Sequence, residues 1–206
     1  MIFRDRIDAA QQLAKALSAY QGKNPLVLAI PRGAVPMGRV LADALGGELD
    51  VVLVRKLGAP GSPEFAVGAI DENGWAYVAD YAAEAGADED YLRREKLAQS
   101  KVLKARRAQY TPQRAPIDPR GRIAVVVDDG LATGATMIAA LHSVRARGPA
   151  RLVCAVPVAA RDSLEKVRPY ADEVVCLGTP EPFRAVSLFY RSFPQVEDQE
   201  VEAVLR

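Results

Sequence analysis

The sequence predicts an α/β fold, a doubly wound and mostly parallel sheet of five strands with helices on both faces. Two observations predict it. Short, continuous apolar runs recur along the chain, and such runs are typical of strands that are buried on both faces. Segments with helical spacing of apolar residues separate most of these runs, and a strand-helix-strand order makes the two strands parallel neighbours.

The first part of the chain supplies a helix and a strand-helix-strand unit. Apolar residues spaced from Ile7 to Tyr20 predict a helix that ends before Gly22. Residues 26–30 and 49–54 predict two buried strands. The segment between them predicts a helix over 36–45, with proline in its first turn and two glycines after its end.

The middle of the chain departs from this alternation. Residues 58–63 hold two prolines and no periodicity, which predicts a long mobile loop. Asn73-Gly74 lies between two β-prone runs, 66–71 and 75–79, and this is the strongest short signal of a β-hairpin. Residues 88–110 predict a helix with acidic residues at its start and basic residues at its end, as the helix dipole favours.

The alternation resumes after residue 120. We expect strands at 123–127, 152–157 and 173–177, with helices at 134–147 and 163–170 between them. The tail after Gly178 is rich in proline and aromatic residues and is expected to pack across one end of the sheet. These boundaries predict a single domain over 1–206 with a core at about 25–178. A loop and hairpin insertion spans about 58–80, and the N-terminal helix and residues of about 179–206 lie outside the core.

Composition excludes several classes of protein. The 206 residues carry a net charge of +1 and a mean hydropathy of −0.03, so we expect neither nucleic acid nor membrane as a partner. Cys154 and Cys176 lie in apolar runs and are expected as buried thiols. The first residues show no secretory signal, so a cytoplasmic location is expected. The one histidine, His142, nearly excludes His-based catalysis and multi-His metal sites and is expected to be a packing or surface residue.

The segment after the strand at 123–127 carries the chemistry, because ligands of doubly wound sheets bind outside the carboxyl ends of the strands. Asp128 and Asp129 could accept hydrogen bonds from the vicinal hydroxyls of a sugar or hold a hydrated cation. Small residues, two threonine hydroxyls and the start of the next helix favour an anion there. The predicted phosphate loop consists of Gly130, Leu131, Ala132, Thr133, Gly134, Ala135 and Thr136.

Together these residues predict a site for a ribose joined to a phosphate. The alternative is a plain turn capped by Asp129, which explains one residue and leaves the second acid and both threonines without a role. The chain holds neither the phosphate loop of nucleotide triphosphatases nor the glycine fingerprint of dinucleotide enzymes.

Residues 125–136 resemble the phosphoribosyl pyrophosphate (PRPP) binding motif of the type I phosphoribosyltransferases: a hydrophobic strand, an acidic pair and a Thr-Gly-x-Thr loop. The order of strands and helices over about 25–178 also agrees with that family's fold. Gly130 departs from the pattern, since the family usually has an apolar residue there, and we expect it to loosen the loop.

The resemblance implies a pyrophosphate subsite at two other strand ends. Arg32 and Gly33 follow the first strand, where the family's pyrophosphate loop often has an unusual backbone. Arg55 and Lys56 follow the second strand, and simple solvation of these two is the alternative. A flexible loop that closes over the reaction centre is expected at 58–68, with Glu64 as its one acid.

The resemblance further implies a Mg²⁺-dependent, homodimeric enzyme of nucleotide metabolism. It would transfer the 5-phosphoribosyl group of PRPP to a nucleobase or related nitrogen acceptor and release pyrophosphate. A substrate-bridged Mg²⁺ is expected near Asp128 and Asp129. A regulator that senses PRPP without turnover, and a sugar-phosphate hydrolase, remain the alternatives.

The acceptor is less defined than the sugar phosphate. The resemblance implies that a small terminal hood recognises it, here about 179–206 plus the N-terminal helix. Members that act on 6-oxopurines carry an acidic residue where this chain has Ala132, which makes hypoxanthine or guanine the less expected acceptor. Phe183, Phe189 and Tyr190 in the tail could stack on a flat ring, although plain packing anchors are an equal alternative.

Overall fold

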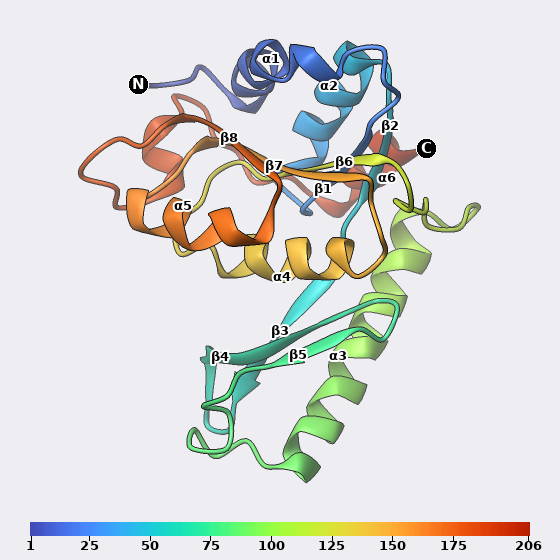
Figure 1. Ribbon diagram of the computed structural model, residues 1–206, viewed down its shortest axis with the longest axis vertical. Helices are drawn as coiled ribbons and strands as arrows, with labels where there is room; N and C mark the ends of the chain where they lie inside the picture. Colours follow the sequence, from blue (N-terminus) through green and yellow to red (C-terminus); the bar gives the residue numbers. More distant parts are fainter.

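A computed structural model describes residues 1–206 and contains two separate sheets (Figure 1). The larger sheet has five strands in the order β2-β1-β6-β7-β8, and every pairing in it is parallel. The predicted fold class is therefore confirmed. The strands are β1 (Leu26–Ala29), β2 (Glu48–Val51), β6 (Ile123–Val127), β7 (Arg151–Val158) and β8 (Glu173–Gly178).

Helices cover both faces of this sheet (Figure 1). On one face lie α1 (Arg6–Ala16), followed by η1 (Ser18–Tyr20), and α2 (Val35–Leu45). On the other lie α4 (Ala135–Arg145) and α5 (Arg161–Val167), followed by η2 (Arg168–Tyr170). Alternate residues of β6 enter two different cores, because successive side chains of a strand point to opposite faces. This explains why the strand sequences are continuously apolar.

The smaller sheet is antiparallel and consists of β3 (Val54–Ala59), β4 (Ser62–Asp71) and β5 (Ala76–Val78). Together with α3 (Glu89–Tyr110) it forms an extension of the main body, which we call the arm (Figure 1). The predicted Asn-Gly hairpin joins β4 to β5. In its turn the Asp71 carboxylate accepts hydrogen bonds from the backbone N–H groups of Asn73 and Trp75, at 2.8 and 2.9 Å.

Two predictions about the arm are wrong. The second strand ends at Val51 instead of residue 54, so Arg55 and Lys56 lie within β3 and not at a strand end of the main sheet. The irregular loop expected at 58–63 and within 58–68 is instead the β3-β4 hairpin, with only its tip at Pro60 and Gly61 outside the strands. That this segment closes over the reaction centre stays a prediction. The glycine at position 58 allows the backbones of β3 and β4 to come close together at Pro63, and Pro60 and Gly61 form the tight turn between the strands.

The N-terminal segment runs beside the part of the tail that precedes α6. The backbone of Phe3 exchanges hydrogen bonds with Phe189 and Arg191, both at 2.8 Å. The tail then forms α6 (Asp198–Leu205), preceded by η3 (Val186–Phe189), and α6 packs against α2 and α3. Cys154 is buried, Cys176 is half-buried, and both are free thiols. None of the helices combines the length and apolar character that a membrane span requires.

Candidate functional site

Asp128 to Thr136 form a compact turn between the end of β6 and the start of α4. Gly134 precedes the first residue of α4 with φ of 82°, a left-handed conformation that favours glycine and lets the chain turn sharply into the helix. The Ser163 hydroxyl of α5 donates to the carbonyl of Ala132 at 2.6 Å and so fixes the outer part of the loop. The side chain of Thr133 remains exposed beside the helix start, where an anion is favoured.

The two acids of the site are partly shielded from solvent and close to one another. The backbone N–H of Asp129 donates to Oδ1 of Asp128 at 2.8 Å. Burial, and then the charge of Asp129, raise the pKa of Asp128 well above its usual range. Burial also raises the pKa of Asp129, although the Arg6 guanidinium opposes this. The pair therefore does not easily carry two charges unless hydroxyl donors or a cation stabilise them.

Asp129 is also held by residues from both ends of the chain. Nε of Arg6 donates to Oδ2 of Asp129 at 3.2 Å, and the Tyr190 hydroxyl donates to the Asp129 carbonyl at 2.7 Å. Arg6 lies 123 residues from Asp129 in the sequence, within an ordinary amphipathic helix. Neither motif nor spacing signals this contact, so sequence reasoning misses Arg6 as a residue of the site.

The structure brings the Arg32-Gly33 pair to the same place. These residues follow β1, which lies next to β6 in the sheet. A side chain at position 33 would overlap the carboxylate of Asp129, so the loop approaches the acid as closely as glycine permits. The peptide bond between Pro31 and Arg32 is cis, in line with the unusual backbone that the resemblance implied. The Arg32 guanidinium lies 3.8 and 3.9 Å from the carboxylates of Glu197 and Asp198.

The other predicted cations and the predicted loop acid lie on the arm. Nε of Arg55 donates to the amide oxygen of Gln99 on α3 at 2.9 Å, and Lys56 is exposed. Glu64 is exposed on β4. No hydrogen bond or ion pair joins these three residues to the acid pair or to Arg32. The prediction assumed that the second strand continues to residue 54, which would place Arg55 and Lys56 at the edge of the main sheet where the acids lie. The strand ends at Val51, so these two residues belong to the arm.

The predicted aromatic residues of the tail divide into two groups. The Tyr190 ring is only 6% exposed and packs against Phe3 and Phe193, with ring centroids at 5.6 and 4.8 Å, so it is not open to stacking on a ligand. Phe183 and Phe189 are half-buried and pack on each other at 4.9 Å. The tail therefore serves as packing at Tyr190 and offers aromatic surface only at the two phenylalanines.

Gly130 does not loosen the loop as expected. A Cβ atom at this position would lie 2.7 and 2.8 Å from the two methyl groups of Val186. The adjacent residue, Leu131, is fixed by backbone hydrogen bonds to Val158 and Ala160. Gly130 thus allows the tail to pack directly on the loop, and that packing holds the loop in place.

The acid pair is a sparse set of ligands for a metal ion. No group of three or more His, Cys, Asp or Glu side chains in the structure is arranged so that it could hold a metal ion. Mg²⁺ usually keeps several waters and binds through one or two carboxylates together with substrate phosphates. Asp128 and Asp129 fit that role, because their carboxylates lie at the strand end beside the anion-favouring turn.

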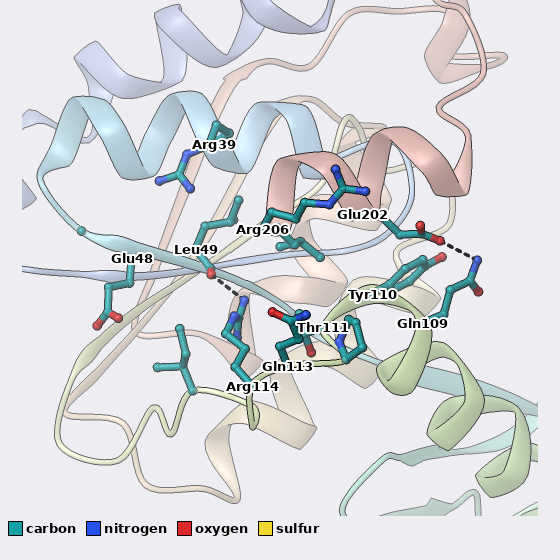
Figure 2. A pocket seen from close by; sticks show the side chains of 14 residues that line it. Arg39, Glu48, Leu49, Gln109, Tyr110, Thr111, Gln113, Arg114, Glu202 and Arg206 are labelled. Carbon is teal, nitrogen blue, oxygen red and sulfur yellow. Dashed lines mark hydrogen bonds between the residues drawn. The ribbon is translucent and has the colours of Figure 1, made fainter.

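A separate cavity of about 780 Å³ lies elsewhere on the molecule (Figure 2). It is bordered by α2, by the amino end of β2, by the end of α3 and by α6, with Arg39, Arg114 and Arg206 around it. The charges of Arg39 and Arg114 are already matched by Asp43 and Asp50. None of the predicted site residues lines this cavity, which lies at the opposite end of the strand from the carboxyl-end site.

Comparisons with known proteins agree on one family. The model of the phosphoribosyl transferase domain matches residues 2–188. Two Mycobacterium tuberculosis proteins that carry phosphoribosyl transferase as a provisional name, MT0597 of strain CDC 1551 and Rv0571c of strain H37Rv, are each 44% identical over 208 residues. These matches cover 99% of this chain but 46% of each relative, so the chain spans about half their length. The crystal structure of TT1426 from Thermus thermophilus is 48% identical, with a TM-score of 0.90 and coverage of 100% of this chain and 98% of that one.

Proposed function

The chain belongs to the phosphoribosyl transferase family, and we propose that it transfers the 5-phosphoribosyl group of PRPP to a nitrogen acceptor, with release of pyrophosphate. One observation carries the proposal: the acid pair, the small-residue turn with its helix start, and the Arg32-Gly33 loop meet at neighbouring strand ends. A diol, a phosphate and a pyrophosphate each find matching groups there.

Each group of the sugar phosphate has a proposed partner. Asp128 and Asp129 accept hydrogen bonds from the ribose 2′- and 3′-hydroxyls. The backbone N–H groups of residues 130–136, with the hydroxyls of Thr133 and Thr136, surround the 5-phosphate at the start of α4. Arg32 contacts the pyrophosphate, and Gly33 lets it approach the backbone. Arg55, Lys56 and Glu64 contribute only if the arm moves toward this end of the sheet.

The proposed chemistry is displacement at C1 of the ribose through an oxocarbenium-like transition state. The acceptor nitrogen forms a bond to C1 while the bond from C1 to the pyrophosphate oxygen breaks. The protein positions both reactants and stabilises charge on the leaving group, chiefly through Arg32. A substrate-bridged Mg²⁺, held near Asp128 and Asp129 through water, would neutralise part of the pyrophosphate charge when bound.

The proposed acceptor is a nucleobase or related nitrogen compound. Ala132 offers no carboxylate to a purine ring proton, which argues against hypoxanthine and guanine. Phe183 and Phe189 are the proposed stacking surface, because their rings remain half-exposed in the tail. A homodimer, a cytoplasmic location and a place in nucleotide metabolism complete the proposal.

The first experiment measures pyrophosphate release from PRPP and Mg²⁺ with a panel of purines, pyrimidines and small amides. Release that depends on one acceptor is expected. Release that requires no acceptor would favour a hydrolase, and binding of PRPP without any release would favour a sensor.

The second experiment tests the acid pair itself by calorimetric titration with PRPP. Asp128→Asn combined with Asp129→Asn is expected to abolish binding, because each amide presents donors to the diol and removes a charged acceptor. Asp162→Asn, an exposed change on α5, is the matched control and should bind as the wild type does. Unchanged affinity in the double variant would reject the ribose assignment.

A further inference from the structure

Asp129 is held at two points, its side chain and its backbone carbonyl. Nε of Arg6 donates to Oδ2, and the Tyr190 hydroxyl donates to the main-chain oxygen. The first contact comes from the start of α1 and the second from the tail after η3. Two segments from opposite ends of the chain thus converge on one acid of the proposed ribose site.

Arg6 is itself held firmly in this position. Its guanidinium lies 3.8 Å from the centroid of the Phe193 ring and donates to the carbonyl of Pro194. Its side chain is only 11% exposed. The guanidinium is planar and has partners on its face and along its edge, and these contacts hold it with its Nε toward Asp129.

The contacts leave particular oxygens of the acid pair free. Oδ2 of Asp129 faces Arg6 and the backbone of Gly33, where no side chain would fit. Oδ1 of Asp128 accepts from the Asp129 N–H. No hydrogen bond from elsewhere in the protein reaches Oδ2 of Asp128 or Oδ1 of Asp129. Apart from each other, the two acids therefore have one oxygen each without a donor from the protein, and the two neighbouring hydroxyls of a ribose are donors of the matching number and spacing.

We propose that Arg6 and Tyr190 are positioning residues that clamp Asp129, so that one free oxygen of each acid faces the ribose diol. This inference rests on the proposed function, because it requires the acid pair to bind a ribose. Arg6 and Tyr190 touch no substrate and act only through Asp129. The terminal segments, which the family resemblance associates with acceptor recognition, thereby also set the ribose contacts.

The test compares two ligands that differ by the sugar phosphate. Binding of PRPP and of inorganic pyrophosphate, each with Mg²⁺, is measured calorimetrically for the wild type, Arg6→Gln and Tyr190→Phe. Arg6→Gln is expected to weaken PRPP binding about 10- to 100-fold, and Tyr190→Phe about 2- to 10-fold, as for loss of a charged and a neutral hydrogen bond. Pyrophosphate binding should change less than about twofold, because pyrophosphate has no diol.

Arg4→Gln is the matched control, since Arg4 is another arginine of the N-terminal segment and its side chain pairs only with Asp8. It should bind both ligands as the wild type does. If an acceptor is identified, Arg6→Gln should raise the KM for PRPP by much more than it lowers kcat. If Arg6→Gln fails to fold, Tyr190→Phe decides, because it keeps the packed ring and removes only the hydroxyl.

Three outcomes overturn the clamp. Equal weakening of PRPP and pyrophosphate binding would mean that Arg6 acts only on the general stability of the site. Unchanged PRPP binding in both variants would reject the clamp while leaving the proposed function intact. Failure of the wild type to bind PRPP would reject the proposed function and the clamp together.

Discussion

Gly130 shows at the scale of one residue how the tail is fixed to the phosphate loop. Its α-carbon lies so close to Val186 that a methyl group would meet both methyls of that valine at 2.7 and 2.8 Å, and a methyl of Val158 at 3.3 Å. Contacts of this kind are shorter than ordinary van der Waals separations. A residue that departs from the family pattern is thus matched by a residue in a different segment.

Gly130→Ala is expected to lower the free energy of unfolding by about 1–3 kcal/mol, as overpacking of a close contact does. Urea unfolding followed by circular dichroism measures the change. Adding Val186→Ala should recover most of the loss, because it removes the two methyl groups that a Cβ would meet. If Gly130→Ala instead stabilises the protein, as glycine replacement does at an open position, the contact is looser than the structure indicates.

Some residues of the site can be predicted from the sequence and others cannot. Asp128, Asp129 and the small-residue turn are contiguous, so a local pattern is enough to predict them and the strand that positions them. Arg6 is not predictable, because its role depends on the packing of α1 against the tail. The sequence predicts a role for the Tyr190 ring in stacking, whereas in the structure the Tyr190 hydroxyl contacts the site by donating to the Asp129 carbonyl. Sequence pattern identifies the groups that face a ligand more readily than those that hold them.

At the scale of elements, a buried ion-pair network attaches α3 to the main sheet. Arg107 of α3 donates to Asp50 of β2 at 2.8 Å and to Glu72 in the hairpin turn at 2.6 Å. Asp50 is 1% exposed and also accepts from the backbone of Ile117 at 2.9 Å. Burial alone would raise the pKa of Asp50, but the Arg107 charge and these hydrogen bonds outweigh it and hold the pKa below its usual value.

Arg107→Met is expected to lower the free energy of unfolding by about 3–5 kcal/mol, because it leaves the buried Asp50 carboxylate without its main partner. Chemical unfolding at pH 7 measures the loss. Lys104→Met, an exposed change on the same helix, is the control and should stay within about 0.5 kcal/mol of the wild type. A loss for Arg107→Met no larger than the control's would mean that other contacts hold α3.

The errors in the predicted elements have a common cause. Residues 49–54 are almost uniformly apolar, so no local signal marks the point where the chain leaves one sheet at Val51 and enters another at Val54. Likewise the sequence around Gly58 predicts a loop, but Gly58 lies in β3. It is so close to the backbone of Pro63 that only glycine fits there. Both features depend on which strands become neighbours. The parallel strands, the Asn-Gly hairpin and α3 are predictable because their signals are local.

Across the molecule as a whole, the arm meets the main body in an aromatic cluster around the one histidine. The His142 ring on α4 stacks on Tyr77 and Trp75 of the hairpin, with centroids at 5.4 and 5.7 Å. It also contacts Tyr170 of η2 at 4.6 Å. This agrees with a packing role for His142, and burial lowers its pKa below the usual 6.5. The attachment of the arm should therefore depend on the protonation of this ring.

The sign of that dependence follows from the lowered pKa. The unfolded chain binds a proton at His142 near pH 6.5, and the folded protein binds it only at lower pH. Between these two values the unfolded state carries more protons, so the contribution of His142 to stability falls as the pH decreases through this window. Above pH 6.5 the neutral ring packs without any cost of burying a charge.

Trp75 is the only tryptophan, so its fluorescence should report directly on this equilibrium. Quenching by the imidazolium is expected to appear on acidification with a midpoint below pH 6.5 in the folded protein, and near 6.5 in urea. His142→Phe should keep the ring contacts and abolish the titration, while Tyr170→Phe, which removes only a hydroxyl, should retain it. A folded-state midpoint at or above 6.5 would contradict burial of His142 between arm and body, because only an exposed or acid-paired ring titrates there.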